Sequence, residues 1–100
     1  MYELSGREEL ESVILVGVAL RDGSKWEEEE SLDELAQLAG TAGARVVEKV
    51  FQQRGAPDPA TLMGSGKAKQ LKAMCGQFGV RTVILNQDLT PAQVRNLEEL

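Results

Sequence analysis

The chain has 100 residues, 42% of them hydrophobic, which is enough for one small domain with a single core and leaves no room for a second domain. There are 16 acidic and 11 basic side chains, and the net charge of −5 argues against indiscriminate binding of nucleic acid by the whole chain. With one cysteine and no histidine, the sequence excludes a disulfide-stapled secreted scaffold, the usual zinc sites and histidine-based catalysis. We therefore predict no metal site and no catalytic residue.

The charges are unevenly distributed along the chain. Residues 1–34 hold 11 acids and 3 bases, whereas residues 35–100 hold 5 acids and 8 bases. The second part is therefore basic, although the chain as a whole is acidic.

The first regular element is expected to be a buried strand. Residues 1–11 show no clear period and are interpreted as a flexible lead-in, with the folded domain spanning residues 12–100. The run Val13–Leu20 is apolar without alternation and rich in β-branched residues, which predicts the central strand of a parallel sheet. It is too short to span a membrane and follows acidic residues rather than the basic start of a signal peptide. We expect the protein in the cytoplasm, without membrane contact.

A helix is expected next. Trp26 is expected to fold back over the edge of the core, and Glu27–Glu30 to lead into the helix as a solvated acidic face rather than a partner site. Ser31 and Glu34 form a capping box that predicts the first turn of this helix. Gly43 predicts its end, because glycine readily adopts the left-handed backbone conformation that stops a helix. The apolar side chains that fall on one side of this helix are Leu32, Leu35, Ala36, Leu38, Ala39 and Ala42.

A second strand and a loop follow. Arg45–Gln53 predicts a strand near the sheet edge, because Glu48 and Lys49 would have no place in a central one. The prolines and glycine after Arg54 predict a surface loop, and Thr61–Met63 predicts one short strand.

The turn Gly64-Ser65-Gly66-Lys67 is the segment best suited to hold a ligand. Glycines let backbone N–H groups approach a partner closely, and the dipole of the following helix adds to the charge of Lys67 and Lys69. A side chain at Gly64 or at Gly66 is expected to be equally harmful. The candidate residues for contact with phosphate or an RNA backbone are Arg54, Gly64, Ser65, Gly66, Lys67 and Lys69. The alternative is a helix start capped by Ser65, without any ligand.

The turn does not match the P-loop pattern of nucleoside triphosphatases. The first glycine of that pattern would fall at Thr61, and the hydroxyl that holds magnesium would fall at Ala68. We therefore predict no nucleotide hydrolysis by this turn.

The last third predicts helix, strand and helix. One helix carries the apolar stripe Leu71, Met74, Cys75 and Phe78 and closes at Gly79. Thr82–Leu85 predicts another apolar strand, which ends in the polar residues 86–88 at the carboxyl edge of the sheet. Thr90 and Gln93 form a second capping box, with Pro91 at the first helical position. The whole pattern predicts an α/β fold, a small mostly parallel β-sheet with helices packed on both faces, truncated at the C-terminal helix as in a piece of a longer protein.

Several segments together resemble one known family. These segments are Ile14–Val18, Ser31–Leu35, Thr41–Ala44, Val46–Val47, Pro57–Thr61, Gly64–Lys67, Leu89–Gln93 and Arg95–Glu98. In residues 12–100 the chain resembles the N-terminal domain of HflX-type GTPases, the ribosome-associated translational GTPases. Leu62 departs from the family, in which an aromatic residue is expected beside the glycine-rich turn.

The resemblance implies a regulatory domain that docks on the large ribosomal subunit and its RNA, and that modulates a GTPase domain and a helical domain later in the parent chain. It implies that the residues that bind GTP and Mg²⁺ belong to that later domain, so this fragment is expected to have no cofactor and no enzymatic activity. The alternative is an independent phosphate- or nucleotide-binding module that uses the Gly64–Lys67 turn. We also expect the fragment to self-associate through a face left uncovered by truncation.

Overall fold

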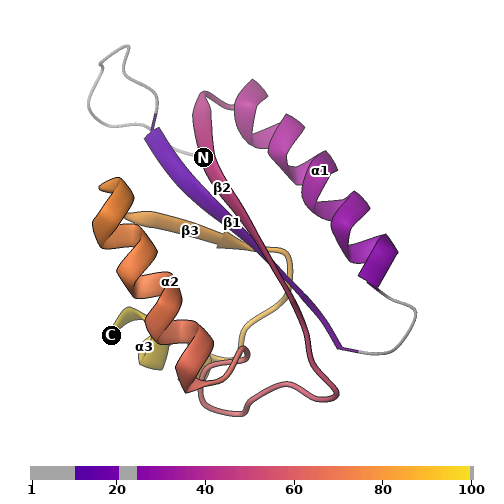
Figure 1. Ribbon diagram of the computed structural model, residues 1–100, viewed down its shortest axis with the longest axis vertical. Coiled ribbons are helices and arrows are strands. Elements are labelled where there is room, and N and C mark those ends of the chain that lie inside the picture. The colour runs from indigo at the N-terminus through magenta and orange to yellow at the C-terminus, as the bar shows by residue number, and fades with distance from the viewer. Residues whose placement is uncertain (1–10, 21–24, 100) are drawn as a thin grey trace.

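The computed structural model describes residues 11–20 and 25–99, which form one parallel sheet between two layers of helices (Figure 1). The strands are β1 (Glu11–Ala19), β2 (Ala44–Gln53) and β3 (Thr82–Leu85), in the order β2-β1-β3. All strand pairs are parallel, and the central position predicted for the first strand is confirmed. Residues 1–10 of the predicted lead-in lie outside the described part of the chain, and Glu11 is the first residue of β1.

Helices cover both faces of the sheet, as the α/β prediction requires. The helix α1 (Lys25–Thr41) lies on one face, and α2 (Ser65–Phe78) and α3 (Pro91–Glu98) lie on the other (Figure 1). Among the described helices, none is long and apolar enough to cross a membrane.

Strand β1 forms the centre of the core because both of its faces are covered. Every residue from Val13 to Ala19 is buried. Val13 and Leu15 pack with Leu32 and Ala39 of α1. Side chains of the opposite parity pack with α2 and with the residues that precede it: Ile14, Val16 and Val18 contact the cluster of Leu62, Met63, Ala68 and Leu71. The uninterrupted apolar run is thus explained by alternation between two helical layers.

A side chain continues the sheet where β3 ends. The backbone N–H of Val18 donates to Oε1 of Gln87 at 3.1 Å, and Nε2 of Gln87 donates to the Val18 carbonyl at 2.5 Å. Asn86 donates its backbone N–H to the carbonyl of Val16 at 3.0 Å. The polar residues after β3 therefore satisfy the hydrogen-bonding groups of the buried backbone at Val16 and Val18, as a longer β3 would.

The start of α1 differs from the prediction. The helix begins at Lys25, so Ser31 and Glu34 lie inside it and the predicted capping box is wrong. Glu27 and Glu28 occupy the first turn, where negative charge is favourable to the helix dipole. The side chain of Trp26 is 71% exposed and does not fold back over the core.

The predicted helix ends are confirmed, whereas part of each apolar stripe is not buried. Gly43 and Gly79 adopt positive φ angles of 94° and 67° just after α1 and α2. The side chains of Leu38 and Phe78 are 67% and 41% exposed, and Ala42 is also exposed. Of the two predicted stripes, Leu32 and Ala39 of α1 and Leu71 of α2 are buried, so each helix lies at the surface with part of its stripe exposed.

Candidate functional site

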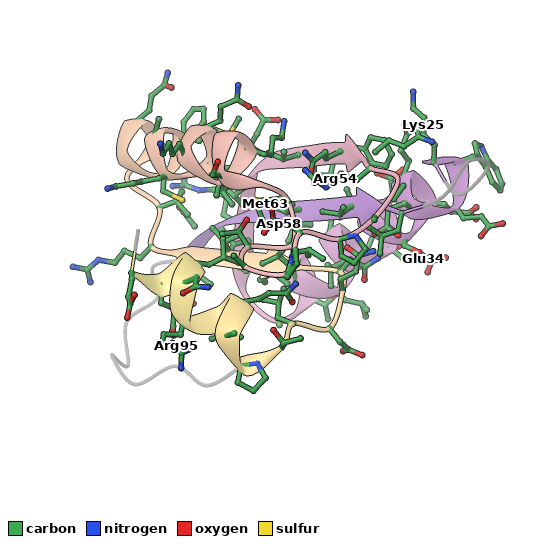
Figure 2. The ribbon with its side chains drawn as sticks, turned by 90° about the horizontal axis from the view of Figure 1, so that it is seen from below. Lys25, Glu34, Arg54, Asp58, Met63 and Arg95 are labelled. Carbon is green, nitrogen blue, oxygen red and sulfur yellow. The ribbon has the colours of Figure 1, made fainter. Side chains whose placement is uncertain are left out.

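The loop between β2 and α2 is an ordered turn rather than a strand. Figure 2 shows Asp58 and Met63 of this loop between α2 and α3, with Arg54 beside the first turn of α2. Asp58 accepts hydrogen bonds through Oδ1 from the backbone N–H of Ala60 at 2.8 Å and of Thr61 at 3.0 Å. Its own N–H and carbonyl pair with Leu62 at 2.9 and 2.8 Å. The short strand predicted at residues 61–63 is therefore wrong, because an aspartate-centred turn takes up its backbone groups.

Leu62 and Met63 anchor this loop in the core. Leu62 has a φ of 68°, which is unusual for a residue with a side chain, and it is 3% exposed. Met63 is 1% exposed and packs in the same cluster. The residue at which an aromatic side chain was expected is thus a core residue, and its side chain does not reach a ligand at the surface.

Arg54 bonds to its own loop. Its Nη1 donates to the Met63 carbonyl at 3.0 Å, and its Nε donates to the Ala56 carbonyl at 3.0 Å. Gln52 donates through Nε2 to the same Met63 carbonyl at 3.0 Å. Arg54 therefore shapes the turn before α2, in addition to carrying charge.

The first turn of α2 is open. Gly64 is the N-cap with φ 87° and ψ 154°, and no side chain caps the helix. Ser65, predicted as the cap, is instead the first helical residue and is exposed. The first N–H groups of a helix lack partners within it, so this turn can accept an anion through its backbone.

The structure brings together most of the candidate contact residues. The segment Gly64–Lys67 forms the first turn of α2, and the guanidinium of Arg54 lies next to Gly64, since a Cβ added there would be 2.6 Å from Nη1. Lys69 lies on another side of α2 than Lys67, because a step of two residues rotates the direction of a side chain around a helix by about 200°. Lys67 and Lys69 therefore present charge on different sides of the helix.

A contact that the sequence did not predict joins the loop to α3. Gln93 is 5% exposed, and its Nε2 donates to the Asp58 carbonyl at 2.8 Å. One turn later, Nδ2 of Asn96 donates to the Ala60 carbonyl at 3.0 Å. The predicted capping box with Thr90 is confirmed, with hydrogen bonds of 3.0 and 3.1 Å. In the sequence, the indication of this contact was that Gln93 and Asn96 are polar and three residues apart, so that they share one face of the helix.

Asp58 makes the loop sensitive to acid. The backbone N–H of Ala60, followed by that of Thr61, holds the pKa of the Asp58 carboxyl below its ordinary value of 3.8. A carboxyl group with a lowered pKa in the folded state stabilises the fold above about pH 4, and this contribution is lost as the pH falls through the folded-state pKa.

We expect Asp58→Asn to be less stable than the wild type at pH 6, because the amide oxygen is a weaker acceptor than the carboxylate. The difference should shrink as the pH falls below about 4. Urea unfolding of both proteins across this pH range measures it, with the exposed Asp88→Asn as control. A difference that stays constant with pH would contradict the assignment.

An open apolar groove separates α3 from α2 and β3. It has a volume of about 600 Å³, and its walls include Leu71 and Cys75 of α2, Val83 of β3, and Val94 and Leu97 of α3. Cys75, on the apolar stripe predicted for this helix, is partly buried against the core, and burial raises the pKa of its thiol. Within residues 11–20 and 25–99, no group of three or more acidic or cysteine side chains is placed to hold a metal ion.

Comparison with known proteins identifies related chains. Residues 29–100 match the family described as GTP-binding GTPase N-terminal. A GTPase HflX of Lacrimispora saccharolytica is 38% identical over 98 residues, which cover 98% of this chain and 23% of that protein. A GTPase HflX of Flavobacterium psychrophilum is 33% identical over 90 residues, with coverage of 90% and 22%. A GTPase HflX of Escherichia coli is 35% identical over 71 residues, with coverage of 71% and 17%. The chain spans less than a quarter of the length of these relatives.

Proposed function

Because the chain belongs to the family of GTP-binding GTPase N-terminal domains found in GTPases HflX, we propose that it is the regulatory and ribosome-binding domain of such a GTPase. It docks on the large ribosomal subunit and its RNA, and it modulates the GTPase domain and the helical domain of the full-length protein in the cytoplasm. GTP and Mg²⁺ bind in that GTPase domain, whereas this domain carries no cofactor.

The open turn of α2 is the observation that supports this function. Lys67 lies in the first helical turn, where uncapped N–H groups and the helix dipole add to its charge. Phosphate contacts supply most of the affinity and salt dependence of nucleic-acid binding. The backbone of Gly64–Lys67 and the side chain of Lys67 therefore face the RNA in our proposal, and Arg54 keeps the turn in shape beside them. Lys69, on another side of α2, adds positive charge to the helix without sharing this contact.

The acidic face of the domain favours the same orientation. The exposed acidic side chains of α1 are Glu27, Glu29, Glu30, Asp33 and Glu34. This helix covers the face of the sheet opposite to α2 and α3. RNA would repel the α1 face, so the domain docks with the loop and α2 toward the ribosome.

Lys67→Ala should weaken binding of the full-length protein to purified large subunits and lower the salt slope by about one unit, the effect of losing one phosphate contact. Nucleotide affinity of the GTPase domain should not change. Cosedimentation across a salt series measures this effect. The matched control is Lys25→Ala, which removes a lysine from α1 on the opposite face. A variant that binds like the wild type at every salt concentration would return the loop to a structural role.

The second candidate function is independent phosphate or nucleotide binding at the Gly64–Lys67 turn, which the same open helix start favours. We expect neither GTP nor ATP to be hydrolysed, because Ala68 has no hydroxyl for magnesium and Thr61 replaces the first P-loop glycine. Titration of this chain with both nucleotides at low salt, followed by amide NMR and by phosphate release, separates the two functions. Turnover that disappears in Lys67→Ala would overturn the expectation.

Self-association of the isolated domain also remains a proposal. Strand β3 is at an edge of the described sheet, and the apolar groove lies beside it. Unpaired strand edges and apolar surfaces both favour association. Light scattering over a concentration series tests this proposal, which a strict monomer at high concentration would contradict.

A further inference from the structure

Two side chains of α3 hold the loop that precedes α2. We call this contact the clasp: Gln93 and Asn96 donate to the carbonyls of Asp58 and Ala60 at 2.8 and 3.0 Å. Gln93 is almost fully buried, and its Oε1 accepts from the N–H of Thr90, so the side chain is fixed at both ends. A buried amide with both groups bonded holds one orientation, because each lost bond would leave an unsatisfied polar group.

The two flanks of α3 differ in how they are held. The clasp joins one flank of the helix to the loop, whereas Val94 and Leu97 line the open groove on the side of α2 and β3. Leu97 still packs against the core. The clasp is therefore the polar contact that sets the position of α3 relative to the loop.

Hydrogen bonds, together with the chain itself, lead from the clasp to the open turn of α2. Asp58 pairs with Leu62 through both backbone groups. The next carbonyl, that of Met63, accepts from Arg54 and from Gln52. Gly64 follows directly and begins the helix. The loop is thus a bonded unit, and its position is transmitted to the groups proposed to contact RNA.

We propose that Gln93 and Asn96 are positioning residues that couple α3 to the RNA-contacting turn of α2. This inference rests on the proposed function, since it assumes that the turn binds an anionic backbone. The clasp holds the turn in its binding geometry before the ligand arrives, which lowers the ordering cost of binding. Because coupling is reciprocal, binding at the turn also fixes the orientation of α3.

A double-mutant cycle in the full-length GTPase that carries this domain tests the coupling, with cosedimentation on purified large ribosomal subunits as the readout. The variants are Asn96→Ala, Lys67→Ala and the double variant. Asn96 makes a hydrogen bond at the surface, so its loss should leave the domain folded. Glu98→Gln is the control, because Glu98 is exposed on α3 and lines the groove rather than the loop.

We expect Asn96→Ala to weaken binding about fivefold, as the loss of one hydrogen bond that positions the turn would. In the Lys67→Ala background the same change should weaken binding less than about twofold, because the charged contact that the clasp positions is already gone and only the backbone contacts of the turn are left to misplace. Glu98→Gln should bind like the wild type.

Each other outcome overturns a definite part of the proposal. If Lys67→Ala weakens binding but Asn96→Ala has no effect, or the same effect in both backgrounds, the clasp does not position the turn and the coupling is wrong. A simple loss of folded protein would give that second pattern, since it lowers binding equally in both backgrounds. If Lys67→Ala binds like the wild type, the proposed function fails together with the inference.

Discussion

Replacing Gly64 by alanine should destabilise the domain by about 3 kcal/mol, the combined cost of an unfavourable backbone conformation and a displaced charged hydrogen bond. The φ of 87° and ψ of 154° at Gly64 lie in a region that essentially only glycine adopts. The added Cβ would also lie 2.6 Å from Nη1 of Arg54. Arg54 would have to move away from the Met63 carbonyl, so the turn before α2 would lose the hydrogen bond that Arg54 donates to it.

The second glycine of the same turn is the matched control. A Cβ added at Gly66 meets no atom within 4 Å, and Gly66 lies inside α2 rather than at its cap. Gly66→Ala should therefore be neutral or stabilise by up to about 1 kcal/mol, because alanine favours a helix over glycine. The structure thus separates two glycines that the sequence pattern treats as equivalent. The free energy of unfolding from urea titrations measures both variants, and equal stability of the two would refute this account.

The two capping boxes show how far local sequence patterns predict helix starts. The box at Thr90 and Gln93 is used, whereas the box at Ser31 and Glu34 lies within α1. Pro91 explains the difference, because proline disfavours helical conformation at the residue before it and so stops α3 from extending backward. Before Ser31 the chain offers four glutamates, which are good helix formers and favourable in a first turn. The same capping-box pattern therefore starts a helix in one place and not in the other, because the residues that precede it differ.

The strands were easier to predict, since their signals are local. The apolar run of β1 and the charged residues of β2 predicted both the type and the sheet position of these two strands. The apolar run of β3 predicted a strand, but it did not indicate that β3 lies half-buried at an edge of the described sheet. The open turn of the candidate site could also be located, because its glycines and lysines are contiguous.

The support of the candidate site could not be predicted, because it is made by distant residues. Gln93 and Asn96 contact residues that precede them by 35 and 36 positions. Nothing local to Arg54 indicates that its guanidinium turns back onto its own loop. The loop and the start of α3 are both among the segments that resemble the HflX family, and the clasp joins them in the structure.

The contact between Gly17 and Leu32 should produce the other large effect on stability. Gly17 lies in the second half of β1, where an added Cβ would be 2.9 Å from both Cγ and Cδ1 of Leu32 on α1. The helix therefore packs against the strand at a distance that only glycine permits. Gly17→Ala should destabilise the domain by about 1–3 kcal/mol through overpacking. Leu32→Ala should cost about 2–5 kcal/mol, because Leu32 is 3% exposed and its removal leaves a cavity.

The double variant distinguishes this contact from two independent losses. In Gly17→Ala/Leu32→Ala the new methyl group occupies part of the space that the leucine leaves, so the two costs should not add. We expect the double variant to be more stable than the sum of the single effects by at least about 1 kcal/mol. Gly40→Ala is the control, since a Cβ there meets no atom within 4 Å and alanine favours α1. Strict additivity in urea unfolding would show that α1 moves to accommodate the methyl group, and that the close approach of helix and strand is not fixed by Gly17.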